Sequence, residues 1–437
     1  MRISRKFQIP NIEDFKINLL EWSQQFKHVV WLDSNNQFVN KTPQNHSDYD
    51  AILAIGAHSI LECNYKNSFS RLKDYHQKTS DYLFGYLGYD LKNDIESLHS
   101  TNFDGLQFND LCFFQPKKLF FIKDTLVEVK YLPSYSDEID MDLETITAFQ
   151  PEQKLHTFDD IKIKRRIHKD EYFNKLNKVL AHIHRGDIYE VSFCQEFYAE
   201  NSEINPVDVY SKLNEISAAP FSTFLRLDQK YLLSASPERF LKRTKNTVIS
   251  QPIKGTTKRG KNSIEDTILK QNLENDLKER TENIMIVDLV RNDLSRSAIK
   301  GSVKVTELCK AHSFKQVHQL ISTVISEVSK DTDSITILKS LFPMGSMTGA
   351  PKIAAMKIIE ELEETKRGLY SGAVGYISPT KDFDFNVVIR SILYNATNKY
   401  ISYSVGGAIT SKSNPENEYE ECLIKAKAMR DVLLNSN

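Results

Sequence analysis

Residues 247–256 read Thr-Val-Ile-Ser-Gln-Pro-Ile-Lys-Gly-Thr, and they place Lys254 between a strand-like apolar stretch and a glycine. The backbone can hold a lysine at such a position and direct it into a cleft. Lysine is a useful nucleophile only when it is neutral, which requires burial or a nearby cation to lower its pKa. Because Lys258, Arg259 and Lys261 follow directly, the alternative is a solvated lysine at a basic turn.

The composition is that of a globular protein with a large core. The chain has 437 residues, of which 40% are apolar and 26% are charged, and this length allows two or three domains. The net charge of −1 creates no bulk field that favours nucleic acid or an anionic membrane. No apolar run approaches the roughly 18 residues of a membrane span. No apolar segment follows the basic N-terminal residues, so we expect no signal peptide. From the net charge and the lack of a membrane span, we expect neither a nucleic-acid partner nor a membrane partner.

The cysteines are scattered and no CxxC pair is present. This spacing argues against a disulfide framework or a zinc site, and it suits a reducing, cytoplasmic environment. The five cysteines are Cys63, Cys112, Cys194, Cys309 and Cys422.

Strands and helices do not alternate regularly along the chain. We expect strands at 28–32, 83–89, 111–122, 188–198, 223–227, 231–235, 240–243, 372–377, 385–394 and 400–403, and helices at 169–185, 263–291, 347–365 and 415–434. This order favours an α+β fold with large antiparallel β-sheets flanked by helices. We divide the chain into a β-rich segment at 1–132, a polar, Pro-containing linker at 133–160 and a catalytic domain at 161–437.

Two pairs of glutamates are candidates for binding a metal ion. Glu279 and Glu282 are three residues apart on one helical stretch, and Glu418 and Glu421 share a face of another. If the two pairs face each other, they supply the hard oxygen ligands that Mg²⁺ prefers. The alternative is two solvated helix faces, with Glu421 and Lys425 forming an ordinary i,i+4 ion pair.

Three loop-like segments remain open to more than one interpretation. Backbone N–H groups at 404–408 form either an anion nest or a plain tight turn. The segment 342–352 lacks the GxxxxGK[ST] spacing, which excludes a nucleotide-triphosphate loop. Glu238 is either a general acid or the ion-pair partner of Arg239 at a turn.

Taken together, these segments resemble the chorismate-utilising enzymes, which include anthranilate, aminodeoxychorismate, isochorismate and salicylate synthases. The resemblance covers about 165–430 closely and the first 160 residues weakly, through 84–86 and 89–90. It implies the fold of that family. The matching stretches are 186–189, 236–239, 252–256, 282–294, 348–352, 371–377 and 418–425.

The residue before Gly255-Thr256 distinguishes the branches of this family. Anthranilate and isochorismate synthases carry alanine there, whereas the branch that makes 4-amino-4-deoxychorismate carries lysine, as at Lys254. The resemblance thus implies amination of chorismate by ammonia, on the route to 4-aminobenzoate and folate. In this reaction the lysine attacks C2 as the C4 hydroxyl leaves, and ammonia then attacks C4 and expels the lysine. We expect the pKa of Lys254 to be depressed.

The resemblance also implies roles for other residues. Mg²⁺ is expected on Glu282 and Glu421, with Glu279 and Glu418 acting directly or through water. The remaining roles are protonation of the leaving hydroxyl by Glu238, binding of the enolpyruvyl carboxylate by Arg390 and Tyr376, binding of the ring carboxylate by Gly406, Gly407, Ala408 and Lys425, and a substrate hydrogen bond from Thr348.

Two positions depart from the family pattern. Glu190 replaces the usual glutamine, and a carboxylate there would orient water or ammonia, or help to charge Lys254. Gln319 occupies the position of the histidine that anthranilate synthase uses to eliminate pyruvate, and His318 lies one residue earlier. If this segment is helical, adjacent residues point about 100° apart, so His318 cannot substitute.

These departures leave alternatives. The first is anthranilate synthase component I, which Lys254 and Gln319 oppose. The second is a regulatory protein that binds chorismate or an amino acid without turnover, which an intact nucleophile opposes. No cysteine sits in a Gly-x-Cys-x-Gly elbow, so we expect ammonia to come from a separate glutaminase subunit or from solution.

Overall fold

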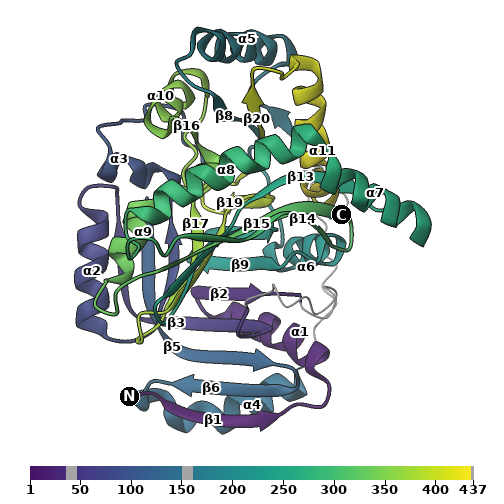
Figure 1. The fold of residues 1–437 in the computed structure, drawn as a ribbon. Coiled ribbons are helices and arrows are strands. Elements are labelled where there is room, and N and C mark those ends of the chain that lie inside the picture. The colour runs from purple at the N-terminus through teal and green to yellow at the C-terminus, as the bar shows by residue number, and fades with distance from the viewer. Residues whose placement is uncertain (36–46, 150–160, 435–437) are drawn as a thin grey trace.

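The computed structural model describes residues 1–35, 47–149 and 161–434. In this part of the chain the strands join into one branched sheet, and helices cover its outer faces (Figure 1). The paired strands run antiparallel, apart from an isolated parallel bridge between Phe103 and Thr365. The structure therefore confirms the expected α+β class with large antiparallel sheets.

The strands follow in chain order as β1 (Ile3–Gln8), β2 (His28–Asp33), β3 (Ala51–Cys63), β4 (Leu83–Leu87), β5 (Leu111–Lys123), β6 (Leu126–Tyr131), β7 (Lys164–Arg165), β8 (Glu190–Ala199), β9 (Phe221–Leu227), β10 (Lys230–Ser236), β11 (Arg239–Thr244), β12 (Thr247–Gln251), β13 (Ile253–Lys258), β14 (Lys304–Ser313), β15 (Val317–Glu327), β16 (Gly349–Ala350), β17 (Ala373–Ile377), β18 (Phe383–Val387), β19 (Ser391–Asn395) and β20 (Tyr400–Thr410).

The α-helices are α1 (Ile12–Trp22), α2 (Ser68–Thr79), α3 (Lys92–Ile95), α4 (Ile139–Ala148), α5 (Lys169–Arg185), α6 (Pro206–Ser217), α7 (Ser263–Asn275), α8 (Leu277–Ser295), α9 (Ser334–Leu341), α10 (Lys352–Leu362) and α11 (Pro415–Leu434). Short 3₁₀ turns are η1 (Ser23–Gln25), η2 (Tyr89–Leu91), η3 (Pro133–Glu138) and η4 (Gly345–Met347).

The sheet branches at β5. One arm runs from β5 through β3, β2, β9, β10, β19 and β20 to β8, and the other runs through β4, β17, β18, β11 and β12 to β15. The long strand β5 serves both arms because β3 pairs along one of its edges, while β4 pairs with the first residues of its other edge and β6 with the last. The two arms carry β8 and β13 to the same end of the molecule (Figure 1).

Two apolar cores form on opposite faces of the first arm. Successive side chains of a strand point to opposite faces, and β2 shows this directly. Val29 and Trp31 belong to the core under α1, α4, α5, α6 and α11, whereas Val30 belongs to the core that α2, α8 and α9 share with the second arm. The cores therefore support both walls of the region where the arms meet.

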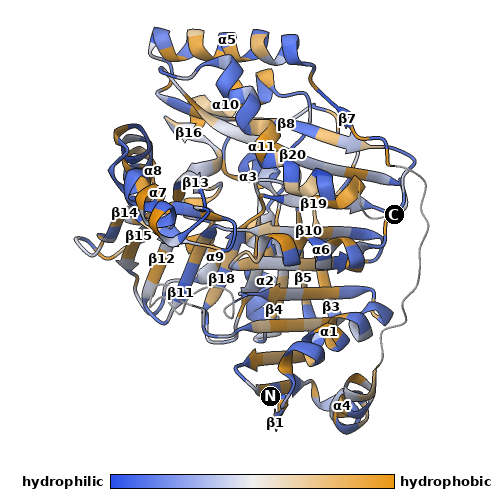
Figure 2. Cartoon of the chain, turned by 90° about the vertical axis from the view of Figure 1, so that its right-hand side faces the viewer, coloured by the Kyte–Doolittle hydropathy of each residue, from blue (hydrophilic) through white to orange (hydrophobic). Residues whose placement is uncertain are grey.

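Helices α5 and α11 begin and end where the sequence predicts. The left-handed Gly186, with φ +87°, ends α5, and Asn414 accepts hydrogen bonds from the first turn of α11, which begins at Pro415. In Figure 2, α5 alternates between hydrophobic and hydrophilic bands, and its buried side includes Tyr172 and Leu176. Such amphipathic helices cover a sheet with one face and meet solvent with the other.

Two predicted elements are interrupted in the structure. The single helix predicted at 263–291 is α7 and α8, because Asp276 leaves helical geometry and caps α8 by accepting from the backbone N–H of Glu279. The strand predicted at 385–394 is β18 and β19, separated at Arg390, which has φ +53°. Both interruptions matter for the site, because they place Glu279 in a first helical turn and Arg390 in a bend.

The predicted linker, 133–160, contains η3 and α4 in its first part, whereas 150–160 lies outside the described residues. The predicted N-terminal segment and catalytic domain share the sheet, since β2 pairs with β9 and β4 pairs with β17. The division into these regions stays a prediction. Among the described helices, none has the length and apolar character that crossing a membrane requires.

Candidate active site

Lys254 lies where the two arms of the sheet meet. It belongs to β13, and the antiparallel partner of that strand is β15. Its Nζ is 3.3 Å from Oε2 of Glu282 on α8 and 3.8 Å from Oε1 of Glu190 on β8. About 20% of the side chain is exposed, so the amine lies in a largely enclosed pocket of carboxylates.

The pKa of Lys254 is raised, and the expected depression is wrong for this arrangement. Burial is the largest single influence and lowers the pKa, but the charges of Glu190, Glu282 and Glu421 together with the hydrogen bond to Glu282 raise it by more. An opposite charge within a few ångströms favours the protonated amine. The lysine therefore becomes a nucleophile only after a carboxylate takes its proton or after a cation offsets the negative charge around it.

The two predicted glutamate pairs approach the strands at glycines. Gly255, with φ +104°, adjoins Glu279, and a Cβ there would lie 2.9 Å from that carboxylate. On β20, a Cβ on Gly407 would lie 3.0 Å from the Glu418 carboxylate and 3.8 Å from that of Glu421. A side chain at either glycine would occupy the space that the glutamates use, and the positive φ of Gly255 is itself unfavourable for other residues.

The charges of the four glutamates act on one another and on Lys254. Burial raises the pKa of Glu279 and the nearby Glu282 raises it further, and burial and Glu421 act in the same way on the pKa of Glu418. The charges of both Glu282 and Glu421 reach Lys254. Acidic side chains from α8 and α11 therefore surround the amine.

The donor chemistry of these glutamates fits Mg²⁺. Carboxylate oxygens suit this ion, which keeps several waters and needs only one or two protein carboxylates. Mutual repulsion between Glu279 and Glu282 is what a cation would relieve. In the described part of the chain, no group of three or more acidic, His or Cys side chains already has the arrangement of a metal site. The residues therefore fit an ion that is bound partly through water.

Glu238 is buried at the turn between β10 and β11, and 5% of it is exposed. The hydroxyl of Ser346 in η4 donates to its Oε1 at 2.6 Å. Burial raises the pKa of Glu238 to about 7, while Ser346 and Lys254 oppose this rise. A carboxyl group with such a pKa can hold a proton near neutral pH and give it up, as a general acid must.

A cavity of about 380 Å³ opens beside these groups, with Pro237, Thr256, Gln319, Arg390 and Lys425 among its lining residues. Its size suits a small organic substrate. Among the described residues, the Arg390 guanidinium has no ion-pair or hydrogen-bond partner, and burial lowers its pKa. A largely buried, unpaired guanidinium is a site for a planar anion such as a carboxylate.

Lys425 and β20 form the opposite wall. Lys425 donates to the carbonyl of Gly406 at 2.7 Å and pairs with Glu421 at 2.6 Å. The segment 404–408 is neither an anion nest nor a tight turn, because Gly406, Gly407 and Ala408 lie within β20 and pair with β8. The β19 strand covers the other edge of β20 only as far as Ser402, so this edge offers backbone groups to a ligand.

The sequence family described as "chorismate binding enzyme" matches residues 21–431, which is most of the chain. The chain belongs to this family.

Two curated relatives of this chorismate-binding enzyme are aminodeoxychorismate synthases. Aminodeoxychorismate synthase component 1 of Escherichia coli (strain K12) is 41% identical over 59% of this chain and 56% of its own. The probable chloroplastic aminodeoxychorismate synthase of Oryza sativa subsp. japonica is 33% identical over 83% of this chain and 44% of its own. This chain thus spans about half the length of these curated relatives.

A solved structure supports the fold. The crystal structure of anthranilate synthase component I from Streptococcus pneumoniae TIGR4 matches with a TM-score of 0.77 and 26% identity, covering 86% of this chain and 91% of that one. The expected fold of the chorismate-utilising enzymes is confirmed.

Of the residues predicted for the site of this chorismate-binding enzyme, Arg390 and Lys425 line the large cavity, whereas Lys254, Glu238 and the four glutamates are not among its described lining residues. We predicted Tyr376 beside Arg390, but Tyr376 stacks on Phe84 at 5.4 Å and lines a separate cavity of about 50 Å³ with Asp384. The tyrosine that lies close enough to influence the pKa of Arg390 is Tyr370, which is buried and which sequence reasoning missed. The only signal for it was its place directly before the matching stretch 371–377.

The Thr348 hydroxyl does not face a ligand in this structure. Thr348 is fully buried, and its Oγ1 donates to the carbonyls of Met344 and Gly345, each at 3.2 Å. This hydroxyl shapes the η4 turn, and the predicted hydrogen bond to substrate would require it to leave both carbonyls.

The segment of His318 and Gln319 is the strand β15, not a helix. Adjacent strand residues point to opposite faces, so His318 still cannot take the place of Gln319. His318 points to Asp266 of α7 at 3.0 Å and to Ser313 at 2.9 Å, whereas Gln319 lines the large cavity. The helical case considered from the sequence does not apply, and the expected separation of the two side chains follows from strand geometry instead.

Proposed function

We propose that the chain is the chorismate-aminating component of an aminodeoxychorismate synthase. It replaces the C4 hydroxyl of chorismate with an amino group from ammonia and forms 4-amino-4-deoxychorismate. The observation that carries this proposal is the amine of Lys254, held among carboxylates in a family whose members bind chorismate. The aminodeoxychorismate synthases of E. coli and rice among its relatives support the same conclusion.

The first half of the reaction uses Lys254 and Glu238. The neutral lysine amine forms a bond to C2 of chorismate, the ring double bonds shift, and the C4–O bond breaks. Glu238 supplies the proton that lets the hydroxyl leave as water. Lys254 must first lose a proton, and Glu190 and Glu282 are the carboxylates nearest to take it.

The second half reverses the shift of the double bonds. Ammonia bonds to C4 and the C2–N bond to Lys254 breaks, which returns the amine to the enzyme. The new ammonium group loses one proton, and the departing lysine nitrogen gains one. Glu190 stands within 3.8 Å of that nitrogen and is positioned to return the proton.

The walls of the cavity suit a substrate with two carboxylates. Arg390 has an unpaired fork for one of them, and Lys425 with the open edge of β20 faces the other. Glu282 and Glu421, supported by Glu279 and Glu418, would hold Mg²⁺. When bound, this ion supplies positive charge that neutralises a substrate carboxylate.

Ammonia is proposed to come from a glutaminase subunit, and the product is proposed to serve 4-aminobenzoate and folate synthesis. The name "component 1" of the E. coli relative supports a partner. The five cysteines are free and buried, which supports work in the reducing cytoplasm.

The experiment is to measure the initial rate of Lys254→Ala at a fixed concentration of free NH₃, with products identified by mass. Loss of the nucleophile should lower the rate by on the order of 10³-fold or more. The matched control is Lys258→Ala, which removes an exposed lysine from the same strand and should leave the rate unchanged.

Incubation of the parent protein with chorismate and no ammonia should also give a covalent adduct on the peptide that contains residue 254. If Lys254→Ala makes 4-amino-4-deoxychorismate at the parent rate, Lys254 is not the nucleophile. If the parent makes anthranilate instead, the chain is an anthranilate synthase and the proposed function is wrong.

A further inference from the structure

Two short backbone segments present groups to the site. The turn η4 presents Ser346 to Glu238, and β8 presents Glu190 to Lys254. The segments are joined, because the backbone N–H of Ser192 in β8 donates to the carbonyl of Thr348 at 2.7 Å. Their relative position therefore sets the geometry around both the proposed nucleophile and the proposed acid.

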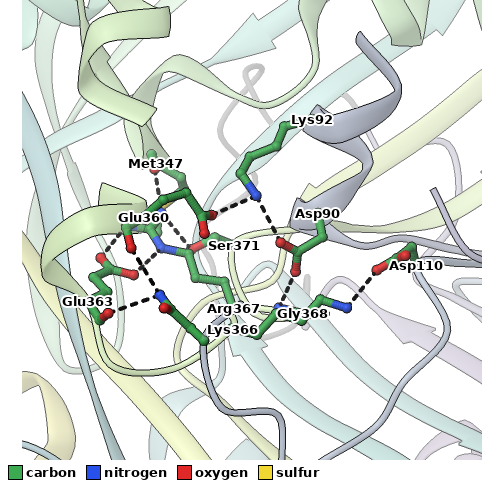
Figure 3. Close-up of polar contacts among 11 residues, drawn as sticks. Asp90, Lys92, Asp110, Met347, Glu360, Glu363, Lys366, Arg367, Gly368 and Ser371 are labelled. Carbon is green, nitrogen blue, oxygen red and sulfur yellow. Dashed lines mark hydrogen bonds and ion pairs between the residues drawn. The ribbon is translucent and has the colours of Figure 1, made fainter. Parts of the chain in front are cut away.

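The guanidinium of Arg367 donates hydrogen bonds to both segments. Arg367 follows α10, and only 6% of it is exposed. Its Nη1 donates to the carbonyl of Met347 at 2.7 Å, and its Nη2 donates to the carbonyl of Ser192 at 2.8 Å. Figure 3 shows Arg367 among Met347, Glu363 and Ser371. Met347 directly follows Ser346, and Ser192 is two residues beyond Glu190 on the same strand.

Glu363 fixes the orientation of this guanidinium through two hydrogen bonds. Its two carboxylate oxygens accept from Nε of Arg367 at 2.8 Å and from Nη2 at 2.6 Å. Oε1 also accepts from the backbone N–H of Cys194 at 2.9 Å, so the carboxylate itself is fixed to β8. Such a two-pronged pair restricts the plane and the position of the guanidinium.

The segment around Arg367 is held by further buried charges (Figure 3). Lys92 pairs with Asp90 at 2.8 Å and with Glu360 at 2.7 Å, and the other oxygen of Asp90 accepts from the N–H of Gly368. A buried ion pair is weak evidence for net stabilisation, because desolvation opposes the attraction. The geometry indicates a further role, since Arg367 uses two donors on carbonyls next to functional residues.

We propose that Arg367, aimed by Glu363, is a positioning residue that fixes Ser346 against Glu238 and Glu190 against Lys254. This inference rests on the proposed function, which makes Glu238 the acid. If Arg367 no longer holds the carbonyl of Met347, the Ser346 hydroxyl drifts away from Glu238. The loss of a hydrogen bond to a carboxylate raises its pKa.

Glu238 also faces other charged groups. The Lys254 charge reaches it from β13. Arg239, at the start of β11, and Asp293, on α8, line the same small cavity as Glu238. Arg239 pairs with Asp384, and Asp293 pairs with Lys352, which makes neither a direct partner of Glu238. Ser346 is thus the hydrogen-bond donor through which Arg367 would act.

The experiment follows the titration of the Glu238 carboxyl group, without substrate, by carboxyl ¹³C NMR or infrared difference spectra assigned with Glu238→Gln. Arg367→Lys keeps the charge but loses the fork, and it should raise the pKa of Glu238 by about one pH unit. Ser346→Ala should give the same shift. The double variant should shift no further than either single variant, because both act through one hydrogen bond.

The matched control is Lys118→Met, which removes a buried cation that pairs with Asp142 and Glu138 in the N-terminal core. It should lower Tm and leave the Glu238 titration unmoved. Glu363→Gln, of nearly the same volume, should shift the titration in the direction of Arg367→Lys, and it carries the test if Arg367→Lys does not fold.

With chorismate and ammonia, Arg367→Lys should lower kcat more than it changes KM, and the alkaline limb of the rate profile should move upward with the titration. If the Glu238 titration is unchanged in both Arg367→Lys and Glu363→Gln, the inference is overturned and the pair only stabilises the core. If the titration moves but the rate profile does not, the positioning role is supported, whereas the acid role of Glu238 in the proposed function fails.

Discussion

Two clusters of enclosed charge in this protein contain the same kinds of residue but differ in their pairing. Around Arg367, acids and bases are matched, and Arg367 contacts Glu363 at 2.6 Å while Lys92 contacts Asp90 at 2.8 Å. Around Lys254, carboxylates outnumber cations, and the nearest lies at 3.3 Å. The matched cluster holds backbone in place. In the unmatched cluster, the excess negative charge of the carboxylates must be compensated by a substrate or an ion. Such uncompensated charge is typical of a functional site.

The largest effect should come from supplying or removing the missing cation of the unmatched cluster. Chelation should abolish turnover and added Mg²⁺ should restore it, because Lys254, Lys278 and Lys425 offset only part of the acidic charge there and a bound cation would offset the rest. Glu421→Ala should also lose turnover and Mg²⁺ binding, measured by calorimetry, without unfolding. Glu420→Ala, which changes the exposed neighbour on α11, is the control. Full activity in excess chelator would show that turnover needs no metal ion.

The matched cluster should respond through stability. Arg367→Met leaves the buried carboxylate of Glu363 without its cation, and we expect the free energy of unfolding to fall by about 3–5 kcal/mol. Urea unfolding of Arg367→Met measures this loss. Exchange of both partners for apolar residues of similar volume should restore much of the stability. A loss below about 1 kcal/mol in Arg367→Met would show that the pair is not an essential part of the core.

The next effect is a pH dependence that belongs to Glu238. Its pKa is about 7 in the folded protein, against 4.5 as the ordinary value. Because the folded state binds the proton more tightly, the stability from Glu238 is fully present below pH 4.5 and is lost as the pH rises through 7. The difference of 2.5 pH units corresponds to about 3 kcal/mol.

Glu238→Gln should lack this dependence, because the amide does not titrate in that range. The measurement is the free energy of unfolding of both proteins at pH values from 4 to 8. Parallel curves for the parent and Glu238→Gln would contradict a raised pKa in the folded state.

Local signals in the sequence predict much of this fold. The bounds of α5 and α11 follow from Gly186 and from Asn414 with Pro415, which act within one turn of the helix. Two ambiguities came from patterns with two solutions. The segment 317–322, with apolar residues at Val317, Leu320 and Ile321, suits a helix or a strand. The break at Asp276 depends on a cap that competes with good helix formers.

The candidate site was predictable in its residue types but not in its geometry. Lys254 and the four glutamates come together as expected, because helix spacing places each pair on one face. The structure places Tyr376 and Arg390 in the linings of different cavities, because the face that a strand side chain occupies depends on the register of the whole sheet. The role of Tyr376 in binding the enolpyruvyl carboxylate stays a prediction. The raised pKa of Lys254 also needed the structure, since Glu190 and Glu282 come from distant parts of the chain.

The smallest expected effect is on the free energy of unfolding, when the same substitution, Glu to Gln, is made in each of the two clusters. Glu279→Gln in the unmatched cluster removes a charge that Glu282 repels, so without Mg²⁺ it should raise the free energy of unfolding by about 0.5 kcal/mol. Glu363→Gln in the matched cluster should lower it, because Arg367 loses its counter-charge. Saturating Mg²⁺ should reverse the order of the parent and Glu279→Gln, since an ion bound to the native state stabilises the protein with the tighter site. If Glu279→Gln is destabilising without Mg²⁺, its charge is already compensated within the protein, and the contrast between the two clusters does not hold.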